Sequence, residues 1–164
     1  MPRLACTLVL VLMMFAGSAV AQNDEAYVGY RQTLMEGIGS DMAAINDILK
    51  YDLPLTRAIQ GHARSMAALA ELVPAAFQHR TSGGASDAKP SVWDDKMSFE
   101  RASNELIAAA RKLLEVADLG EPTAIGNQVQ AVGKTCGDCH ESFRKPEAES
   151  FKRSGLPGDT PEND

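Results

Sequence analysis

Apolar residues recur every three or four positions along much of this chain, which is the spacing of one face of an α-helix. The first such run lies between residues 24 and 50. Its apolar face consists of Leu34, Ile38, Met42, Ile45 and Leu49. The pattern breaks at residues 51–54, where Pro54 suits the first turn of a second helix. We expect that second helix to end or kink at Pro74, because proline lacks the amide hydrogen that the helix needs there.

Two further helices are expected after a loop. Residues 79–91 are rich in Gly, Ser and Thr and include a proline, a composition typical of a loop. A third helix is expected from about Val92 to Asp118, and Gly120 and Pro122 mark its end and the start of the last helix. No alternating run of apolar and polar residues predicts a strand. The sequence therefore predicts an all-α fold, an antiparallel four-helix bundle.

The first 21 residues are expected to be a signal peptide and not part of the fold. Arg3 supplies a positive charge, residues 4–16 are apolar, and Ala19-Val20-Ala21 fits a cleavage site. The competing interpretation, a membrane anchor, is less favoured because the run is short for a bilayer span. The folded domain is expected over residues 22–145, in a protein exported to the periplasm.

The composition indicates a globular protein with an acidic surface and no membrane partner. Of the 164 residues, 45% are hydrophobic and 23% are charged, and the net charge is -6. Cleavage would remove Arg3 and no acidic residue, so the net charge of the mature chain would be -7. Nucleic acid is not an expected partner, because phosphate binding needs a surplus of basic side chains. The prolines and charges of residues 146–164 predict a flexible C-terminal tail.

The residues that indicate chemistry are Cys136, Cys139 and His140, which form the pattern Cys-x-x-Cys-His. This is the attachment pattern of a c-type haem. Residues three apart share a helical face, so both thiols can form thioethers with one porphyrin. The adjacent imidazole can then bind the iron. The two cysteines continue the apolar stripe toward Phe143, so we expect the sulfurs to point into the bundle. The prediction is one covalent haem c, with His140 as the iron ligand.

Three other uses of the cysteines are weaker. A thioredoxin-type redox pair needs a βαβ setting, which the pattern does not predict. A structural zinc site needs four ligands, and His62 and His79 are the remaining soft donors. A simple disulfide would leave His140 without a role.

The place of the motif in the last helix resembles the class II cytochromes c, and most closely the cytochrome c′ family. The resemblance covers about residues 26–145. It rests on the order and spacing of several segments besides the haem motif. These are Tyr30-Arg31-Gln32 with Met35, Leu72-Val73-Pro74-Ala75-Ala76-Phe77, Ala88-Lys89-Pro90-Ser91-Val92-Trp93, Val132-Gly133 and Phe143-Arg144. The tail from Pro146 departs from the family by its length.

The resemblance implies that further residues surround the haem. They are Arg31, Gln32, Met35, Phe77, Asp87, Ala88 and Arg144. Arg31 and Gln32 fall where the family contacts the haem edge and propionates, and a guanidinium can pair bidentately with a carboxylate. Met35 falls where the family places the side chain over the distal face. Phe77 is expected to line the pocket. Asp87 and Ala88 are expected in a loop near the haem, and Arg144 beside the proximal histidine.

Two coordination states follow from different roles of Met35. The resemblance implies a five-coordinate iron with a distal face closed by apolar side chains, which nitric oxide or carbon monoxide can enter. Alternatively, the Met35 sulfur binds the iron, as a first-helix methionine does in low-spin class II relatives, and the protein is a six-coordinate electron carrier. The Tyr30-Arg31-Gln32 run and the long loop before Trp93 favour the five-coordinate state.

The expected role is gas binding or electron transfer and not enzymatic turnover, because no nucleophile–base pair is evident. An acidic surface favours a basic or neutral redox partner protein. The resemblance also implies a homodimer through the first two helices. Candidate dimer contacts are Tyr27, Met42, Ile45 and Met66.

Overall fold

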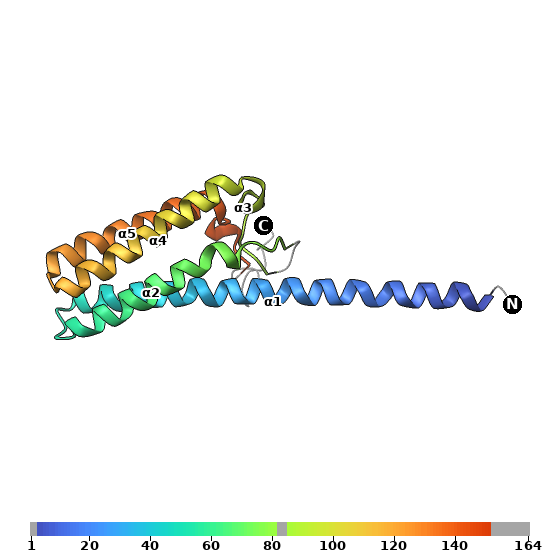
Figure 1. The fold of residues 1–164 in the computed structure, drawn as a ribbon, viewed down its shortest axis with the longest axis horizontal. Helices are drawn as coiled ribbons and strands as arrows, with labels where there is room; N and C mark the ends of the chain where they lie inside the picture. The colour runs from blue at the N-terminus through green and yellow to red at the C-terminus, as the bar shows by residue number, and fades with distance from the viewer. Residues whose placement is uncertain (1–2, 82–84, 152–164) are drawn as a thin grey trace, which may run out of the picture.

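The computed structural model describes residues 3–81 and 85–151, with side chains described from Asn23 onward. Its elements are α1 (Arg3–Lys50), α2 (Thr56–Ala76), α3 (Ser91–Asp94), α4 (Lys96–Leu119), α5 (Pro122–Phe143) and a 3-10 turn, η1 (Glu147–Glu149). Four long helices, α1, α2, α4 and α5, form an antiparallel bundle (Figure 1). Within the described residues there is no β-strand, although Ala88 and Arg144 form an isolated bridge. The predicted all-α four-helix bundle is confirmed.

The helices pack in chain order around one apolar core. α1 packs on α2, α2 on α4, and α4 on α5, whereas the approach between α1 and α5 is more limited. The largest fully buried side chains are Ile45, Met66, Leu113, Ile125, Val132 and Ser103. They come from all four long helices, so burial of these apolar stripes stabilises the bundle as a unit.

The predicted signal peptide falls largely outside the described side chains. Figure 1 shows the N-terminal part of α1 running well beyond the bundle as a continuous helix. Its side chains before Asn23 are not described, so cleavage after Ala21 stays a prediction. Within the described residues, no helix is both long and apolar enough to span a bilayer.

Two predicted helix boundaries were wrong. α2 begins at Thr56, and Pro54 lies in the preceding turn, where Asp52 has a positive φ of 47°. The single helix expected from Val92 is broken at Asp95, whose φ of -118° and ψ of 62° are not helical. The Asp95 carboxylate accepts a hydrogen bond from the Ser98 amide, so this residue caps α4 and starts a new helix. Hydrophobic periodicity alone does not reveal such a cap.

Part of the expected flexible tail lies against the bundle. The chain continues after α5 through η1 to Phe151, and Ser150 is buried. The carboxylate of Asp87 binds this segment, a contact between residues more than 60 positions apart. Residues 152–164 lie outside the described part, so the prediction for them is untested.

The candidate dimer contacts divide into two kinds. Ile45 and Met66 are completely buried inside a single chain, so they belong to the core and the structure contradicts their assignment to a dimer surface. Met42 is half-buried and packs against the core. Tyr27 remains partly exposed, and its ring stacks on that of His79 with centroids 4.2 Å apart.

Candidate haem site

The two cysteines of the motif are free thiols on the inner side of α5. Cys136 and Cys139 are half-buried and pack against the apolar core, as the helical phase predicts. Burial raises the pKa of Cys136. Burial also raises the pKa of Cys139, to about 11, with further contributions from Cys136 and from the Glu105 carboxylate of α4. Both sulfurs are therefore protonated at neutral pH, and they pack against apolar side chains.

His140 ends the motif close to the C-terminus of α5. His140 is exposed at the surface, and none of its ring atoms hydrogen-bonds to another described residue. Partial burial of the ring lowers the pKa of His140, and the positive charge of Arg144 lowers it further. The neutral imidazole that results is the form that binds iron.

The register between α1 and α5 relates Met35 to His140. A Cβ placed on Gly133 would lie 3.5 Å from the Met42 Cε, so these two residues meet where the helices approach. The helices are antiparallel, and seven residues make two turns. Counting two turns from this contact, toward the N-terminus of α1 and the C-terminus of α5, reaches Met35 and His140, so the helical rise places the two residues at a similar level along the bundle. Met35 is half-buried against the apolar core.

Arg31 is held by the end of α2 and the loop that follows it. Its Nε donates to the Ala76 oxygen at 2.8 Å, and one terminal nitrogen donates to Thr81 Oγ1 at 3.0 Å. The other terminal nitrogen donates to the His79 oxygen. The side chain is buried, and this burial lowers its pKa from the ordinary value, although Asp24 opposes the shift. Three of its five N–H groups are used in this way, and the other two donate to no other described residue.

Aromatic rings surround the Arg31 guanidinium. Its central carbon lies 5.0 Å from the ring centroid of Phe77 and 5.3 Å from that of Trp93. The Trp93 indole donates to the Phe77 oxygen at 2.7 Å. Phe77 also packs on Phe99, with centroids 5.1 Å apart, and Phe99 packs edge-on to Phe143 of α5. The predicted pocket residue Phe77 therefore connects α1 to the motif helix.

The loop between α2 and α3 packs on the end of α5. Gln32 donates from Nε2 to the Ala85 oxygen at 2.7 Å, which attaches this loop to α1. Ala88 forms the bridge to Arg144, and the Lys145 amide donates to the Asp87 oxygen at 2.7 Å. The structure thus brings the predicted residues of α1, the loop and α5 to one end of the bundle.

Glu105 and Thr81 also belong to this region, although no pattern in the sequence pointed to them. Glu105 influences Cys139, and Thr81 binds Arg31. Both act through contacts between distant segments, and neither belongs to a local motif. No sequence signal marked them.

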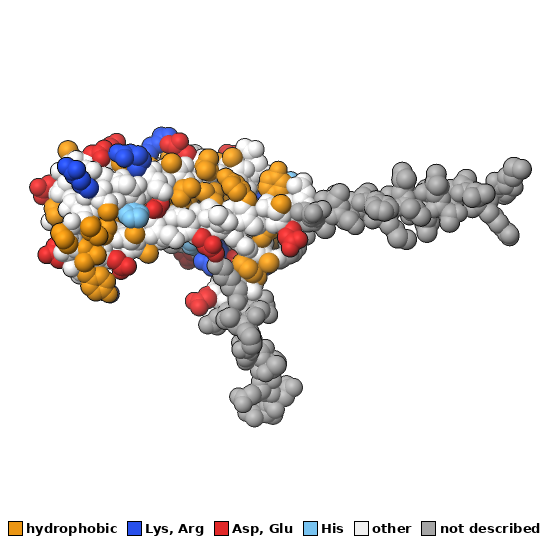
Figure 2. Space-filling view, turned by 90° about the horizontal axis from the view of Figure 1, so that it is seen from below, with side chains coloured by type: hydrophobic (Ala, Val, Ile, Leu, Met, Phe, Trp, Pro, Cys, Tyr) orange, Lys and Arg blue, Asp and Glu red, His pale blue; other side chains and the backbone are white. Residues whose placement is uncertain are grey.

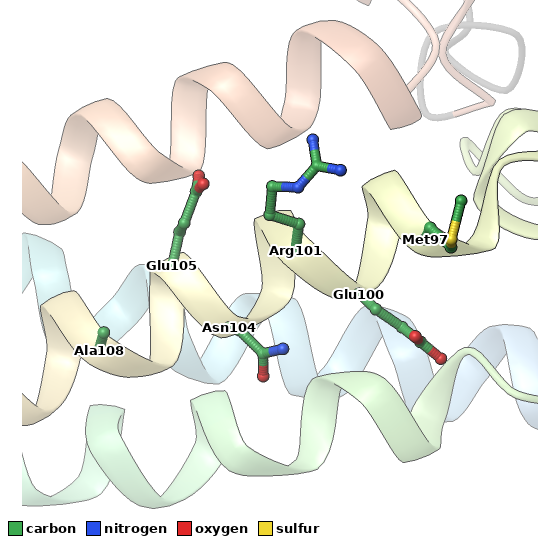
Figure 3. A pocket seen from close by; sticks show the side chains of 6 residues that line it. All are labelled: Met97, Glu100, Arg101, Asn104, Glu105 and Ala108. Carbon is green, nitrogen blue, oxygen red and sulfur yellow. The ribbon is translucent and has the colours of Figure 1, made fainter.

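A separate surface depression lies over α4. It has a volume of about 510 Å³ and is lined by Met97, Glu100, Arg101, Asn104, Glu105 and Ala108. Figure 3 shows Arg101 and Glu105 directed toward α5, with Asn104 on the opposite side of the helix. Glu105 is the one lining residue that also belongs to the site described above. None of the residues predicted to surround the haem lines this depression.

The chemistry of the donor set fits a haem c: two thiols at helical spacing on an apolar surface, an adjacent imidazole, and a methionine at a similar level on the facing helix. The comparisons with known proteins agree. The family model described as Cytochrome C′ matches residues 26–144. The chain belongs to the cytochrome c′ family.

Relatives and solved structures support this assignment over nearly their full lengths. The cytochrome c′ of Rhodospirillum rubrum is 35% identical over 145 residues, which are 88% of this chain and 99% of that protein. A ferrous cytochrome c′ variant from Alcaligenes xylosoxidans with bound nitric oxide aligns with a TM-score of 0.69 at 28% identity, covering 76% of this chain and 97% of that one. A carbon monoxide-bound variant of the same protein aligns with a TM-score of 0.69 at 29% identity, covering 75% and 97%. The cofactor of this family is covalently attached haem c.

Proposed function

We propose that this chain is a periplasmic haem protein whose iron is five-coordinate, bound by His140 alone, and that it binds nitric oxide or carbon monoxide and exchanges electrons. The observation that carries the haem and gas-binding part of this proposal is the family match over residues 26–144, and the packing of Met35 among apolar side chains supports the five-coordinate state. An apolar side chain over the distal face excludes water, while small uncharged gases can still pass. The gas complexes of related proteins support the same role.

Cys136 and Cys139 would hold the haem through two thioethers. Each sulfur bonds to a carbon of a vinyl group, and the thiol hydrogen goes to the other vinyl carbon, so no electrons are gained or lost. When bound, the haem supplies an iron that takes up a diatomic gas or one electron. Their place on one half-buried face of α5 orients both sulfurs toward the same planar group.

Arg31 and Gln32 would contact the haem edge. Two N–H groups of Arg31 remain after its bonds to Ala76, Thr81 and His79, and these can pair with a propionate. Gln32 anchors the loop that carries Asp87 and Ala88. In this proposal Arg31 stabilises the end of α2 and also binds a haem propionate.

The second candidate is a six-coordinate electron carrier. The similar level of Met35 and His140 is also compatible with it, because the Met35 sulfur could then bind the iron as a second protein ligand. Optical and spin-resonance spectra of the ferric protein separate the two states. We expect a high-spin ferric spectrum and direct binding of carbon monoxide to the ferrous form. A low-spin spectrum with a sulfur-to-iron charge-transfer band, lost in Met35→Ala, would show that Met35 is a ligand.

Export and assembly belong to the same proposal. N-terminal sequencing of the protein recovered from the periplasm should begin at Gln22. Figure 2 shows hydrophobic side chains on the face formed by α1 and α2. Tyr30 of α1 and Leu72 of α2 are among the exposed large hydrophobic residues of these two helices. This face would bind a second copy, so Leu72→Glu should shift the sedimenting species toward monomer.

The redox partner would be basic or neutral. The chain carries a net charge of -6, so electrostatic attraction should raise the rate of association. Electron transfer should therefore slow as ionic strength rises. A rate that is independent of salt would indicate a neutral partner, and a rate that rises with salt would contradict this part of the proposal.

A further inference from the structure

The segment Lys145–Phe151, here called the C-terminal latch segment, lies beyond the family match but is attached to the haem-bearing end of the bundle. The family model ends at residue 144. Ser150 nevertheless has only 5% of its surface exposed.

Asp87 provides the attachment with both of its carboxylate oxygens. Ser150 Oγ donates to Oδ2 at 2.7 Å, and the Phe151 amide donates to Oδ1 at 2.9 Å. The main chain adds a third bond, from the Lys145 amide to the Asp87 oxygen at 2.7 Å. Lys145 Nζ also donates to the Ser86 oxygen at 2.9 Å. Both ends of the latch segment are therefore bound to one short stretch of loop.

The same carboxylate faces a positive charge. A terminal nitrogen of Arg144 lies 3.5 Å from Asp87 Oδ2, and the Asp87 side chain is only 11% exposed. Burial by itself would raise the pKa of Asp87. The hydrogen bonds from Ser150 and Phe151 and the charge of Arg144 outweigh that effect, so the pKa is lowered. Asp87 thus remains ionised in a nearly buried position.

Arg144 connects this cluster to the iron ligand. Its amide donates to the His140 oxygen at 3.0 Å, at the C-terminal end of α5. We propose that Asp87 is a positioning residue that fastens the C-terminal latch segment across the end of α5 and holds and neutralises Arg144 beside His140. This inference rests on the proposed function in taking His140 as the haem ligand.

The test uses the haem-loaded full-length protein with Asp87→Asn, which keeps the shape of the side chain and removes its charge. We expect the Phe151 amide to exchange its hydrogen about tenfold faster or more, because the neutral amide oxygen of Asn is a weaker acceptor than a carboxylate oxygen. We also expect a higher reduction potential, because the charge of Arg144 is no longer neutralised and disfavours the ferric state. The matched control is Asp94→Asn, which removes the same charge from an exposed ion pair with Arg80 and should change neither quantity.

A second variant distinguishes loss of the latch contact from misfolding of the protein. Ser150→Ala removes one bond to Asp87 and leaves the charge pair with Arg144, so it should speed exchange at Phe151 without moving the potential. Unchanged protection of the Leu113 amide, in the buried part of α4, would establish that each variant is folded.

Two results would overturn the inference: exchange at Phe151 as slow in Asp87→Asn as in the natural protein, or a potential that does not move in Asp87→Asn. Both readouts apply to any covalent haem protein. A six-coordinate spectrum would therefore contradict the proposed function and leave this test intact.

Discussion

The Nε of Arg31 donates a hydrogen bond to the main-chain oxygen of Ala76 at 2.8 Å. Ala76 is the last residue of α2, where the carbonyl groups have no partners inside the helix. One α1 side chain therefore caps the end of the neighbouring helix and, through Thr81, also holds the loop after it. This arrangement connects the stability of the bundle to the region expected at the haem edge.

Arg31→Ala should lower the free energy of unfolding by about 2–4 kcal/mol, because it leaves buried acceptors without donors. Urea unfolding of the haem-loaded protein measures this change. Arg111→Ala is the control, since Arg111 forms an exposed pair with Glu71 that is expected to contribute at most about 1 kcal/mol. Equal losses in the two variants would mean that the Arg31 network does not stabilise the fold.

Met35→Ala should leave the ferric protein high-spin and speed carbon monoxide binding to the ferrous form. Removing the side chain over the distal face should raise the association rate about tenfold, which corresponds to about 1.4 kcal/mol of barrier. Flash photolysis measures the rate. Met97→Ala is the control, because Met97 is 77% exposed on α4 and should have no effect. An unchanged rate in Met35→Ala would remove Met35 from the gas path.

Asp87 should make stability depend on pH in the acid range. Its pKa in the folded protein is lowered from 3.8, so the ionised group stabilises the fold above that value, and the contribution disappears as the pH falls through the folded pKa. The stability difference between the natural protein and Asp87→Asn should therefore be constant above about pH 5 and shrink in stronger acid. Urea unfolding from neutral to acid pH tests this. A constant difference throughout would show that the carboxylate is not stabilised by folding.

Gly120→Ala and Gly126→Ala should change stability in opposite directions. Gly120 follows α4 with a φ of 75°, a left-handed conformation that costs an alanine about 1 kcal/mol. Gly126 lies inside α5, where a Cβ would meet no atom within 4 Å, so alanine should stabilise by about 0.5–1 kcal/mol. Thermal unfolding of both variants measures the contrast. A loss in Gly126→Ala would point to a steric contact absent from this structure.

Local patterns in the sequence determined much of this protein. Helical periodicity is a property of neighbouring residues, so the four long helices and the inward-facing sulfurs of Cys136 and Cys139 could be predicted before any contact was known. The haem motif is equally local, because its chemistry needs only two thiols and an imidazole at fixed spacing. For the same reason the family could be suspected from the order of short segments.

The tertiary structure alone decided which residues far apart in the sequence contact one another. Asp95 ends one helix by capping the next, Ile45 and Met66 are core and not dimer surface, and Arg31 binds the end of α2. The attachment of Phe151 to Asp87 likewise joins residues far apart in the chain. Burial and ion pairing depend on which surfaces meet when the helices pack, and no local spacing records that geometry.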